Sequence, residues 1–192
     1  MAPSQGHDLS VRFDYLFSQK LQFYIRLKTE TKQEKIVEGE KYLNTAVQTV
    51  KLRLHMDFTI SDCWKLRTRA EYSQYQKSEK EQGFMLYQDI VYSSANESFS
   101  TQGRIVYTQT DSYNTRIYAY ENDLLYNYSM PAYYGKSIRT YLNTKFEITK
   151  NWELWFKIGN TYYPALETIG SGQNEVAGQM LTEVKIQTRL KF

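Results

Sequence analysis

The sequence predicts an all-β protein that forms an antiparallel, up-and-down transmembrane β-barrel, with about nine or ten strands in this chain. Residues alternate between apolar and polar with a period of two along almost every segment, as expected of strands that have two different faces. Several of these segments reach the roughly 9 to 11 residues with which a tilted strand crosses a bilayer. Tight turns also alternate with longer connections, which is how membrane barrels are built.

The predicted strands follow one another from the N-terminus to the last residue. In each, most apolar residues recur at every second position, and the polar residues between them would form the opposite face. The segments with this pattern are Leu9–Phe17, Leu21–Leu27, Val50–Ile60, Trp64–Glu71, Phe84–Tyr92, Phe99–Tyr107, Ile138–Ile148, Trp152–Ile158 and Val184–Phe192. We therefore treat residues 1–192 as a single barrel domain.

The connections between these strands differ in length. Tight turns are predicted at Ser18–Lys20, Ser61–Asp62, Ala95–Ser98 and Thr149–Asn151, and longer connections at Lys32–Asn44, Lys77–Gln82 and Pro164–Gly178. Gln33–Tyr42 is predicted to be a charged loop with room for one helical turn. Thr115–Gly135 leaves two alternatives: an excursion that begins and ends outside the membrane, which we prefer, or one further crossing.

Composition excludes several other classes of protein. Mean hydropathy is −0.63, and no apolar run approaches the roughly 18 residues of a membrane helix, yet 16% of the residues are aromatic. One cysteine and two histidines predict no internal disulfide, no metal site and no cofactor. The net charge of +3 is too small to predict nucleic-acid binding.

The N-terminal residues Met1–Ser10 lack the charged and apolar regions of a signal peptide, which a secreted barrel requires. We therefore expect this chain to be a C-terminal portion of a longer protein, whose barrel has further strands upstream.

Two segments carry a resemblance to known proteins. The last strand, with Ile186, Leu190 and Phe192 on one face and Thr188 between them, resembles the C-terminal signal by which outer-membrane barrels are recognised for assembly. Asp111–Asp123 and Pro131–Lys136 resemble the C-terminal barrel of outer-membrane proteins from Bacteroidota-type bacteria that carry periplasmic helix-hairpin-helix repeats. The resemblance covers Gly83–Phe192 and implies an outer-membrane location, with the lipid bilayer and the assembly machinery as partners. Thr188 stands at a position that is usually apolar, and Leu190 where Tyr is common.

The polar face of the predicted barrel is rich in charged residues, with Asp89, Glu153 and Lys157 among them. The candidates for the lining of the lumen are Lys51, Arg53, His55, Asp57, Arg67, Arg69, Glu71, Arg104, Arg139, Lys145, Glu147, Lys185 and Arg189. Because a barrel of about ten strands is mostly filled by its own side chains, these residues could form a salt-bridged core. Alternatively, they line a cationic lumen that admits small anionic or zwitterionic solutes.

Arg116, Tyr118, Tyr120, Glu121 and Asp123 are candidates for an outer loop that contacts ligands. For the neighbouring tyrosines, an aromatic girdle at the bilayer interface or packing within the loop is the preferred interpretation. Two carboxylates without further oxygen ligands predict hydrogen bonding within the loop rather than a calcium site. His55 and Asp57 share a strand face, but no serine stands in a recognisable nucleophile context, so we predict no catalytic site.

The function predicted from these observations is transport or passive permeation of small solutes through an outer-membrane barrel, without enzymatic activity. Two alternatives stay open. The barrel could be non-conducting and anchor a periplasmic domain or partner, or the chain could be a soluble β-barrel or sandwich that binds a ligand. The oligomeric state is not predicted.

Overall fold

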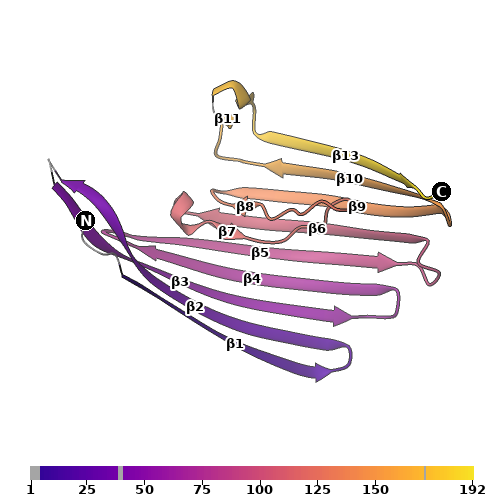
Figure 1. Cartoon of the computed structure of the whole chain (residues 1–192), viewed down its shortest axis with the longest axis horizontal. Coiled ribbons are helices and arrows are strands. Elements are labelled where there is room, and N and C mark those ends of the chain that lie inside the picture. Colours follow the sequence, from indigo (N-terminus) through magenta and orange to yellow (C-terminus); the bar gives the residue numbers. More distant parts are fainter. Residues whose placement is uncertain (1–4, 39–40, 171) are drawn as a thin grey trace.

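One large antiparallel sheet makes up most of the computed structural model, which describes residues 5–38, 41–170 and 172–192 (Figure 1). Its nine strands pair in the order β1-β2-β3-β4-β5-β6-β9-β10-β13, and each neighbouring pair is antiparallel. The predicted all-β, antiparallel, up-and-down fold is confirmed. The strands are β1 (Gly6–Ser18), β2 (Leu21–Glu38), β3 (Lys41–Thr59), β4 (Trp64–Gln76), β5 (Lys80–Ser93), β6 (Phe99–Thr110), β9 (Ser137–Thr149), β10 (Trp152–Tyr162) and β13 (Met180–Leu190).

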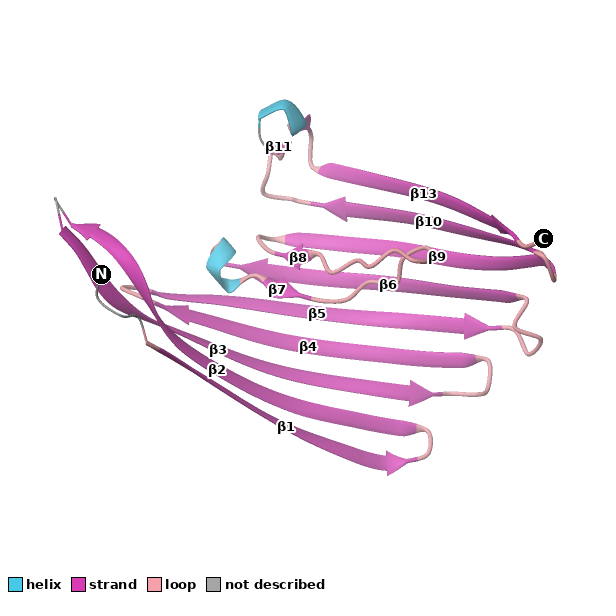
Figure 2. Cartoon of the chain, in the orientation of Figure 1, coloured by secondary structure: helices cyan, strands magenta, loops and turns pink. Residues whose placement is uncertain are grey.

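The remaining elements are short and lie in connections (Figure 2). β7 (Ile117–Tyr118) pairs with β8 (Ala132–Tyr133), and β11 (Thr168–Ile169) pairs with β12 (Val176–Ala177). Two 3₁₀ turns cover Tyr113–Thr115 and Gly172–Asn174. Because β6 pairs directly with β9, the segment between them adds no strand to the large sheet. The preferred arrangement of nine strands plus an excursion is confirmed.

The two ends of the strands differ, although the connection predicted to be longer at Lys77–Gln82 is a short turn between Gln76 of β4 and Lys80 of β5. All four tight turns lie along one edge of the sheet, together with the C-terminus, and we call this the tight-turn edge (Figure 1). The opposite edge, which we call the loop edge, holds the longer connections that follow β6 and β10. Among the described residues no helix is long or apolar enough to cross a membrane, a finding that does not bear on crossing by strands.

The prediction of a charged loop at Gln33–Tyr42 is wrong. β2 and β3 stay in register from Leu21↔Phe58 through Glu34↔Thr45 to Glu38↔Lys41, so this segment is a long hairpin. Polar residues on both faces of this segment suggested a loop. A solvent-exposed hairpin needs no apolar face, however, when its backbone hydrogen bonds continue from strands that are already paired. Gly39 and Glu40, between the two strands, lie outside the described residues.

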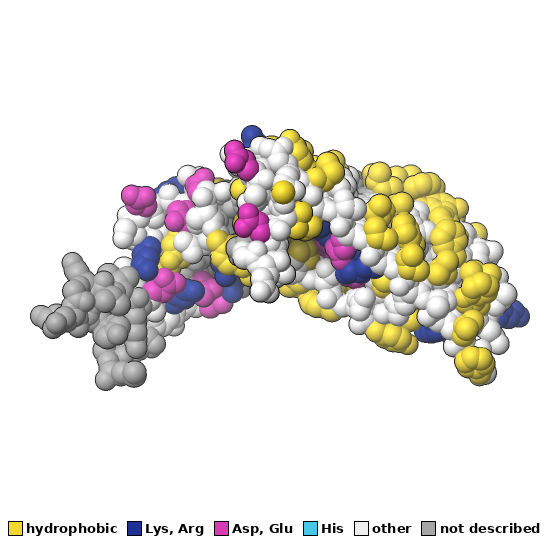
Figure 3. All heavy atoms as spheres, turned by 90° about the horizontal axis from the view of Figure 1, so that it is seen from above, with side chains coloured by type: hydrophobic (Ala, Val, Ile, Leu, Met, Phe, Trp, Pro, Cys, Tyr) yellow, Lys and Arg dark blue, Asp and Glu magenta, His cyan; other side chains and the backbone are white. Residues whose placement is uncertain are grey.

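The two faces of the sheet have opposite chemistry. The alternating apolar residues are exposed on one face, which we call the outer face, from Leu9 (62%) on β1 through Ile105 (53%) on β6 to Val184 (55%) on β13. Figure 3 shows apolar side chains gathered toward the tight-turn edge and charged ones toward the loop edge. We call the other face the inner face. This is the reverse of a water-soluble core, in which such side chains would be covered.

Aromatic side chains form a row on the outer face close to the tight-turn edge. The ring centroids of Trp64 and Tyr92 are 4.7 Å apart, those of Tyr92 and Phe99 5.9 Å, and those of Phe99 and Phe146 5.0 Å. The row therefore runs across β4, β5, β6 and β9. Aromatic rows at one level of a barrel are typical of the boundary between lipid and water.

Candidate functional site

The inner face carries the candidate site. Strand register places the predicted lining residues on this one face, because partners such as Arg53↔Glu71 and Asp57↔Arg67 continue from strand to strand. The residues brought together in this way are Lys51, Arg53, His55, Asp57, Arg67, Arg69, Glu71, Arg104, Arg139, Lys145, Glu147, Lys185 and Arg189. Lys157, Asp89 and Glu153 lie among them and are buried.

The connection Asp111–Lys136, which we call the inner loop, runs over this face rather than away from the sheet. Its backbone forms a narrow hairpin, in which Ile117 pairs with Tyr133 and Glu121 bridges Ser129. Residues of the loop alternate in exposure: Ile117, Ala119 and Glu121 are buried, whereas Tyr118 and Tyr120 are exposed. The loop therefore presents one side to the sheet and the other to the open side of the structure.

Apolar contacts attach both arms of the loop. Ile117, Ala119 and Tyr133 of the loop form a buried cluster with Met85, Tyr87 and Val106 of the sheet. The inner face is therefore not uniformly polar, because β5 and β6 supply apolar residues where the loop crosses them. Burial of this kind stabilises by roughly 25 cal/mol for each Å² removed from water.

Gly83 on β5 allows the loop to approach the sheet closely. A Cβ atom at this position would lie 2.6 Å from the carbonyl oxygen of Thr115, at the end of the 3₁₀ turn. The Thr115 hydroxyl donates to the carbonyl of Gln82 at 3.2 Å, and the Asp111 amide donates to the same carbonyl at 2.8 Å. Glycine is thus required by packing rather than by a special backbone angle.

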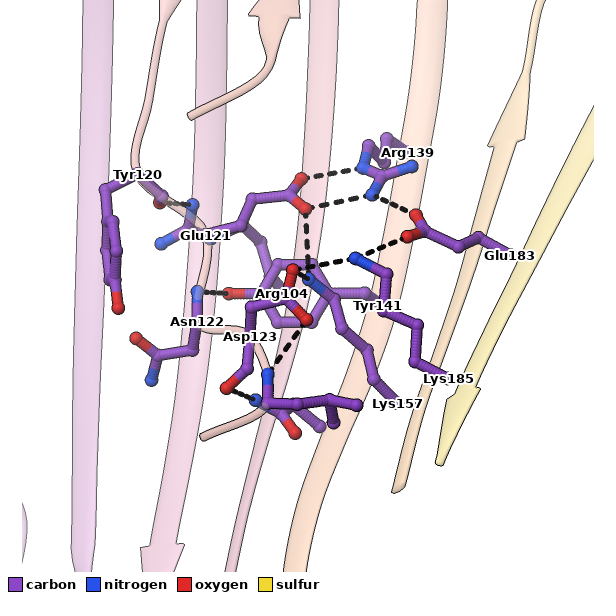
Figure 4. A network of polar contacts seen from close by, with 12 residues as sticks. Arg104, Tyr120, Glu121, Asn122, Asp123, Arg139, Tyr141, Lys157, Glu183 and Lys185 are labelled. Carbon is purple, nitrogen blue, oxygen red and sulfur yellow. Dashed lines mark hydrogen bonds and ion pairs between the residues drawn. The ribbon is translucent and has the colours of Figure 1, made fainter. Parts of the chain in front are cut away.

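Ion pairs attach the loop farther along the same arm, at Glu121 and Asp123 (Figure 4). Arg139 on β9 donates to both carboxylate oxygens of Glu121, from Nε at 2.6 Å and from Nη2 at 2.9 Å. Lys157 Nζ on β10 lies 3.5 Å from Glu121 and 3.5 Å from Asp123, and Lys185 Nζ on β13 lies 2.8 Å from Asp123. Two loop carboxylates thus connect three strands of the sheet.

The surroundings of these carboxylates are dry. Glu121 is 0% and Lys157 1% exposed, and the hydroxyl of Tyr133 donates a further hydrogen bond to Glu121. Both carboxylates belong to the connecting loop, outside the strands. Burial raises the pKa of Glu121, but the hydrogen bonds and charge of Arg139 outweigh it, so the pKa lies below its ordinary value. Burial likewise raises the pKa of Asp123, but the hydrogen bond from Lys185 opposes it, and this pKa also lies below its ordinary value.

Side chains on the inner face of the sheet also donate hydrogen bonds to the backbone of the loop. Arg69 donates to the carbonyl of Tyr118 at 2.9 Å, Arg104 donates to that of Tyr120 at 2.5 Å, and Asn143 donates to that of Asp123 at 3.1 Å. These bonds satisfy carbonyl groups of the loop that would otherwise lack a hydrogen-bond partner against the sheet. The loop is therefore held along its length and not only at its ends.

Further carboxylates, on the strands themselves, neutralise cations of the sheet that the loop carboxylates do not pair with. Asp89 pairs with Arg104, and Glu71 accepts hydrogen bonds from Arg53 at 2.7 Å and from Arg69. Glu153 pairs with Arg189 and, at 3.1 Å, with Lys145. The predicted salt-bridged packing is present over this part of the inner face.

An open cavity of about 420 Å³ adjoins the loop on the side of β2 to β4. Charged side chains around it include Lys65, Arg67, Arg69 and Arg104, with Asp57 and Asp89 as the acidic members. His55 Nε2 lies 3.0 Å from Asp57, and Asp57 lies 3.3 Å from Arg67. Cations predominate in this lining, so the cavity could accept a small anion. Within the described residues no three His, Cys, Asp or Glu side chains form a group that could hold a metal ion.

The structure separates the residues predicted for an outer loop. Glu121 and Asp123 lie against the wall, Tyr118 and Tyr120 are exposed, and Arg116 donates to the Tyr118 hydroxyl at 2.8 Å. Sequence reasoning counted Tyr133 among the neighbouring tyrosines of the predicted loop or girdle and did not single out Tyr141; both are buried beside the carboxylates. The alternation of Ile117, Ala119 and Glu121 was a usable signal for a segment with one covered side.

Comparisons with known proteins support the fold alone. No family model and no curated protein matches the chain. Among solved structures, CdiB from Acinetobacter baumannii, an outer-membrane β-barrel protein, has a similar structure, with a TM-score of 0.62 and 10% sequence identity. The match covers 98% of this chain and 36% of that chain, so the whole sheet described here spans about a third of the length of the protein that it resembles.

Proposed function

We propose that this chain forms the wall of an outer-membrane β-barrel that takes part in transport or passive permeation of small solutes, without enzymatic activity. The observation that carries the proposal is the division between an exposed apolar outer face and a charged inner face, from β1 to β13. Soluble monomers rarely expose contiguous apolar patches above a few hundred Å². A bilayer would cover the outer face, and water would fill what the inner loop leaves open.

The chemistry of the inner face supports a preference for anions. Arginine and lysine side chains predominate among the lining residues, and the open cavity is lined by four of them and by two carboxylates, Asp57 and Asp89. Charged linings select ions of opposite sign at close range. Small anionic or zwitterionic solutes are therefore the proposed class of substrate.

The exposed C-terminal strand supports a role for the assembly machinery as a partner. Ile186, Leu190 and Phe192 are exposed, the first two on the outer face of β13, where a recognition signal would be accessible before the barrel closes.

A non-conducting barrel that anchors a periplasmic domain or partner is a second candidate. One observation favours it: the inner loop is fixed by buried ion pairs, with Glu121 0% and Lys157 1% exposed. A loop held so firmly would block much of the lumen.

Recordings from planar bilayers test these proposals on the full-length protein, purified from outer membranes in mild detergent. We expect discrete conductance steps, and a reversal potential in a KCl gradient that shows a preference for chloride. Heat-modifiable migration on gels serves as the control for folding. A folded protein that inserts but never conducts would exclude permeation and leave the anchoring role, which co-purification of a stable partner from native membranes would support.

A further inference from the structure

The first and the last strand of the sheet each lack a strand neighbour on one side in the described chain. β1 pairs only with β2, and β13 pairs only with β10. Edge strands of finished proteins are usually short or protected by proline, charges or bulges. β1 instead has 13 residues, none of them proline, and pairs with β2 in unbroken register from Gly6 to Leu16. In length and composition β1 therefore resembles a strand that has a neighbouring strand on each side.

Both faces of β1 are open. The outer residues Leu9, Val11 and Phe13 are 57% to 62% exposed, as lipid-facing residues are elsewhere in the sheet. The inner residues Asp8 and Asp14 are also exposed, whereas inner residues of the central strands, such as Glu71 and Asp89, are buried. The inner side of β1 therefore lacks the surroundings that the central strands have.

The directions of the two edge strands decide how the sheet can close. Every neighbouring pair is antiparallel, so strands alternate in direction and the first and last of the nine run the same way. Figure 1 shows the arrows of β1 and β13 both pointing to the tight-turn edge. Direct pairing of β1 with β13 would therefore be parallel, whereas bacterial single-chain barrels have an even number of antiparallel strands.

A second copy of the chain does not solve this problem. Rotation about the barrel axis would place β1 of one copy beside β13 of the other, and these strands would again be parallel. A copy turned upside down would pair antiparallel strands, but its tight turns would then lie on the opposite side of the membrane. Assembly from one side of the membrane gives all copies the same orientation.

We propose that an odd number of further membrane-spanning strands, carried by the same polypeptide outside residues 1–192, bridges β1 and β13 and completes the barrel. The proposal rests on the proposed membrane location but not on conduction. Apart from the inner loop and the β11–β12 connection, consecutive strands of the sheet are consecutive in the chain, so the neighbour of β1 would be a strand that precedes it.

The inner loop indicates which side chains the further strands would carry. Tyr126 and Tyr128 at the tip of the loop are 85% and 73% exposed, on a segment whose other side is fixed to β9, β10 and β13. Hydrogen-bonding and aromatic side chains on the inner faces of the further strands would cover these rings. Their outer faces would be apolar, to continue the lipid-facing surface of β1.

Photo-crosslinking in the untruncated protein, in its native membrane, tests the proposal. A benzophenone side chain is introduced at Leu9 and, separately, at Tyr15 on β1, and at Met180 and Ile186 on β13, with Leu52 on the interior strand β3 as control. Peptides joined to each probe are identified by mass spectrometry. Leu52 should yield only peptides of β2 and β4.

We expect the probes on β1 and β13 to yield peptides of the same polypeptide from outside residues 1–192, beside those of β2 and β10. Moving the probe from Leu9 to Tyr15, or from Met180 to Ile186, should shift the joined residue toward the N-terminus of the neighbouring peptide, because that strand is antiparallel. Three results would overturn the proposal: adducts between β1 and β13, a shift of the joined residue toward the C-terminus of the neighbouring peptide at β1 or β13, or adducts with lipid alone. Loss of conductance would not affect these results, whereas recovery of the protein from the soluble fraction would overturn both proposals.

Discussion

Arg139 on β9 holds Glu121 of the inner loop through two hydrogen bonds, of 2.6 and 2.9 Å, in a place where the carboxylate has no contact with solvent. This pair joins the loop to the wall of the sheet. Because a buried ion that loses its partner keeps the full cost of desolvation, the pair is also where the attachment of the loop is most sensitive to substitution.

Replacement of Arg139 by Met is expected to destabilise the folded protein by up to about 3–5 kcal/mol. It removes two hydrogen bonds from the buried Glu121 and leaves beside it only Lys157, at 3.5 Å, and the Tyr133 hydroxyl. The measurement is equilibrium unfolding in lipid vesicles, followed by tryptophan fluorescence. Lys80→Gln, at an exposed position at the start of β5, is the control and should have little effect. Adding Glu121→Gln to Arg139→Met should recover part of the loss, and a double variant as unstable as the single one would contradict this account.

Gly83→Ala is expected to loosen the inner loop, because the new methyl group would lie 2.6 Å from the Thr115 carbonyl. Overpacking of this kind costs about 1–3 kcal/mol. Gly103→Ala is a matched control on the neighbouring strand, where the nearest atoms lie 3.9 Å away. Limited proteolysis of the loop measures the effect, and equal cleavage rates for the two variants would show that Gly83 does not determine how closely the loop packs.

The strands could be predicted from the sequence because their evidence is local. A period of two over a single segment identifies both faces, and the exposed Leu, Ile and Phe residues of the outer face follow directly from it. The hairpin at Gln33–Tyr42 escaped prediction because its pairing is inherited from the strands that lead into it, and its own residues show no apolar face.

The position of the inner loop could not be predicted, because it depends on contacts between distant residues. Glu121 could have paired with any of the wall cations, and only the register of β9 and β10 brings Arg139 and Lys157 to it. Met85 and Val106 gave a partial signal, since apolar residues interrupt the otherwise polar inner face where the loop covers them.

Leu142→Arg tests which medium covers the outer face. Leu142 is 44% exposed near the middle of β9, and an arginine at the bilayer midplane costs about 2–4 kcal/mol. Gln22→Arg places the same charge on the inner side, beside the open cavity, and should be tolerated. The readout is folding into vesicles as seen by heat-modifiable migration. Similar folding of both variants would mean that lipid does not cover Leu142.

Excision of the inner loop tests whether it limits permeation. Because the Thr110 amide donates to the Gly135 carbonyl at 3.2 Å, an Asn-Gly turn in place of Ser112–Tyr134 can close β6 and β9 as a tight hairpin. Single-channel conductance should rise severalfold relative to the unmodified protein. A matched excision of Leu166–Val176 in the connection between β10 and β13 should leave conductance nearly unchanged, and an equal rise in both variants would count against a specific role of the inner loop.

Attachment of the inner loop should depend on pH only in acid. The pKa values of Glu121 and Asp123 are lowered in the folded protein, so their contribution to stability is fully present above the ordinary carboxyl pKa of about 4 and is lost as the pH falls through the lowered values. Hydrogen exchange of the loop amides, corrected for intrinsic rates, should therefore show constant protection from pH 8 to about pH 5 and falling protection below about pH 4. In Glu121→Gln/Asp123→Asn, which lacks both titrating carboxylates, the decline in acid should flatten. A loss of protection between pH 7 and pH 5 would indicate that another group, and not this pair of carboxylates, controls the attachment of the loop.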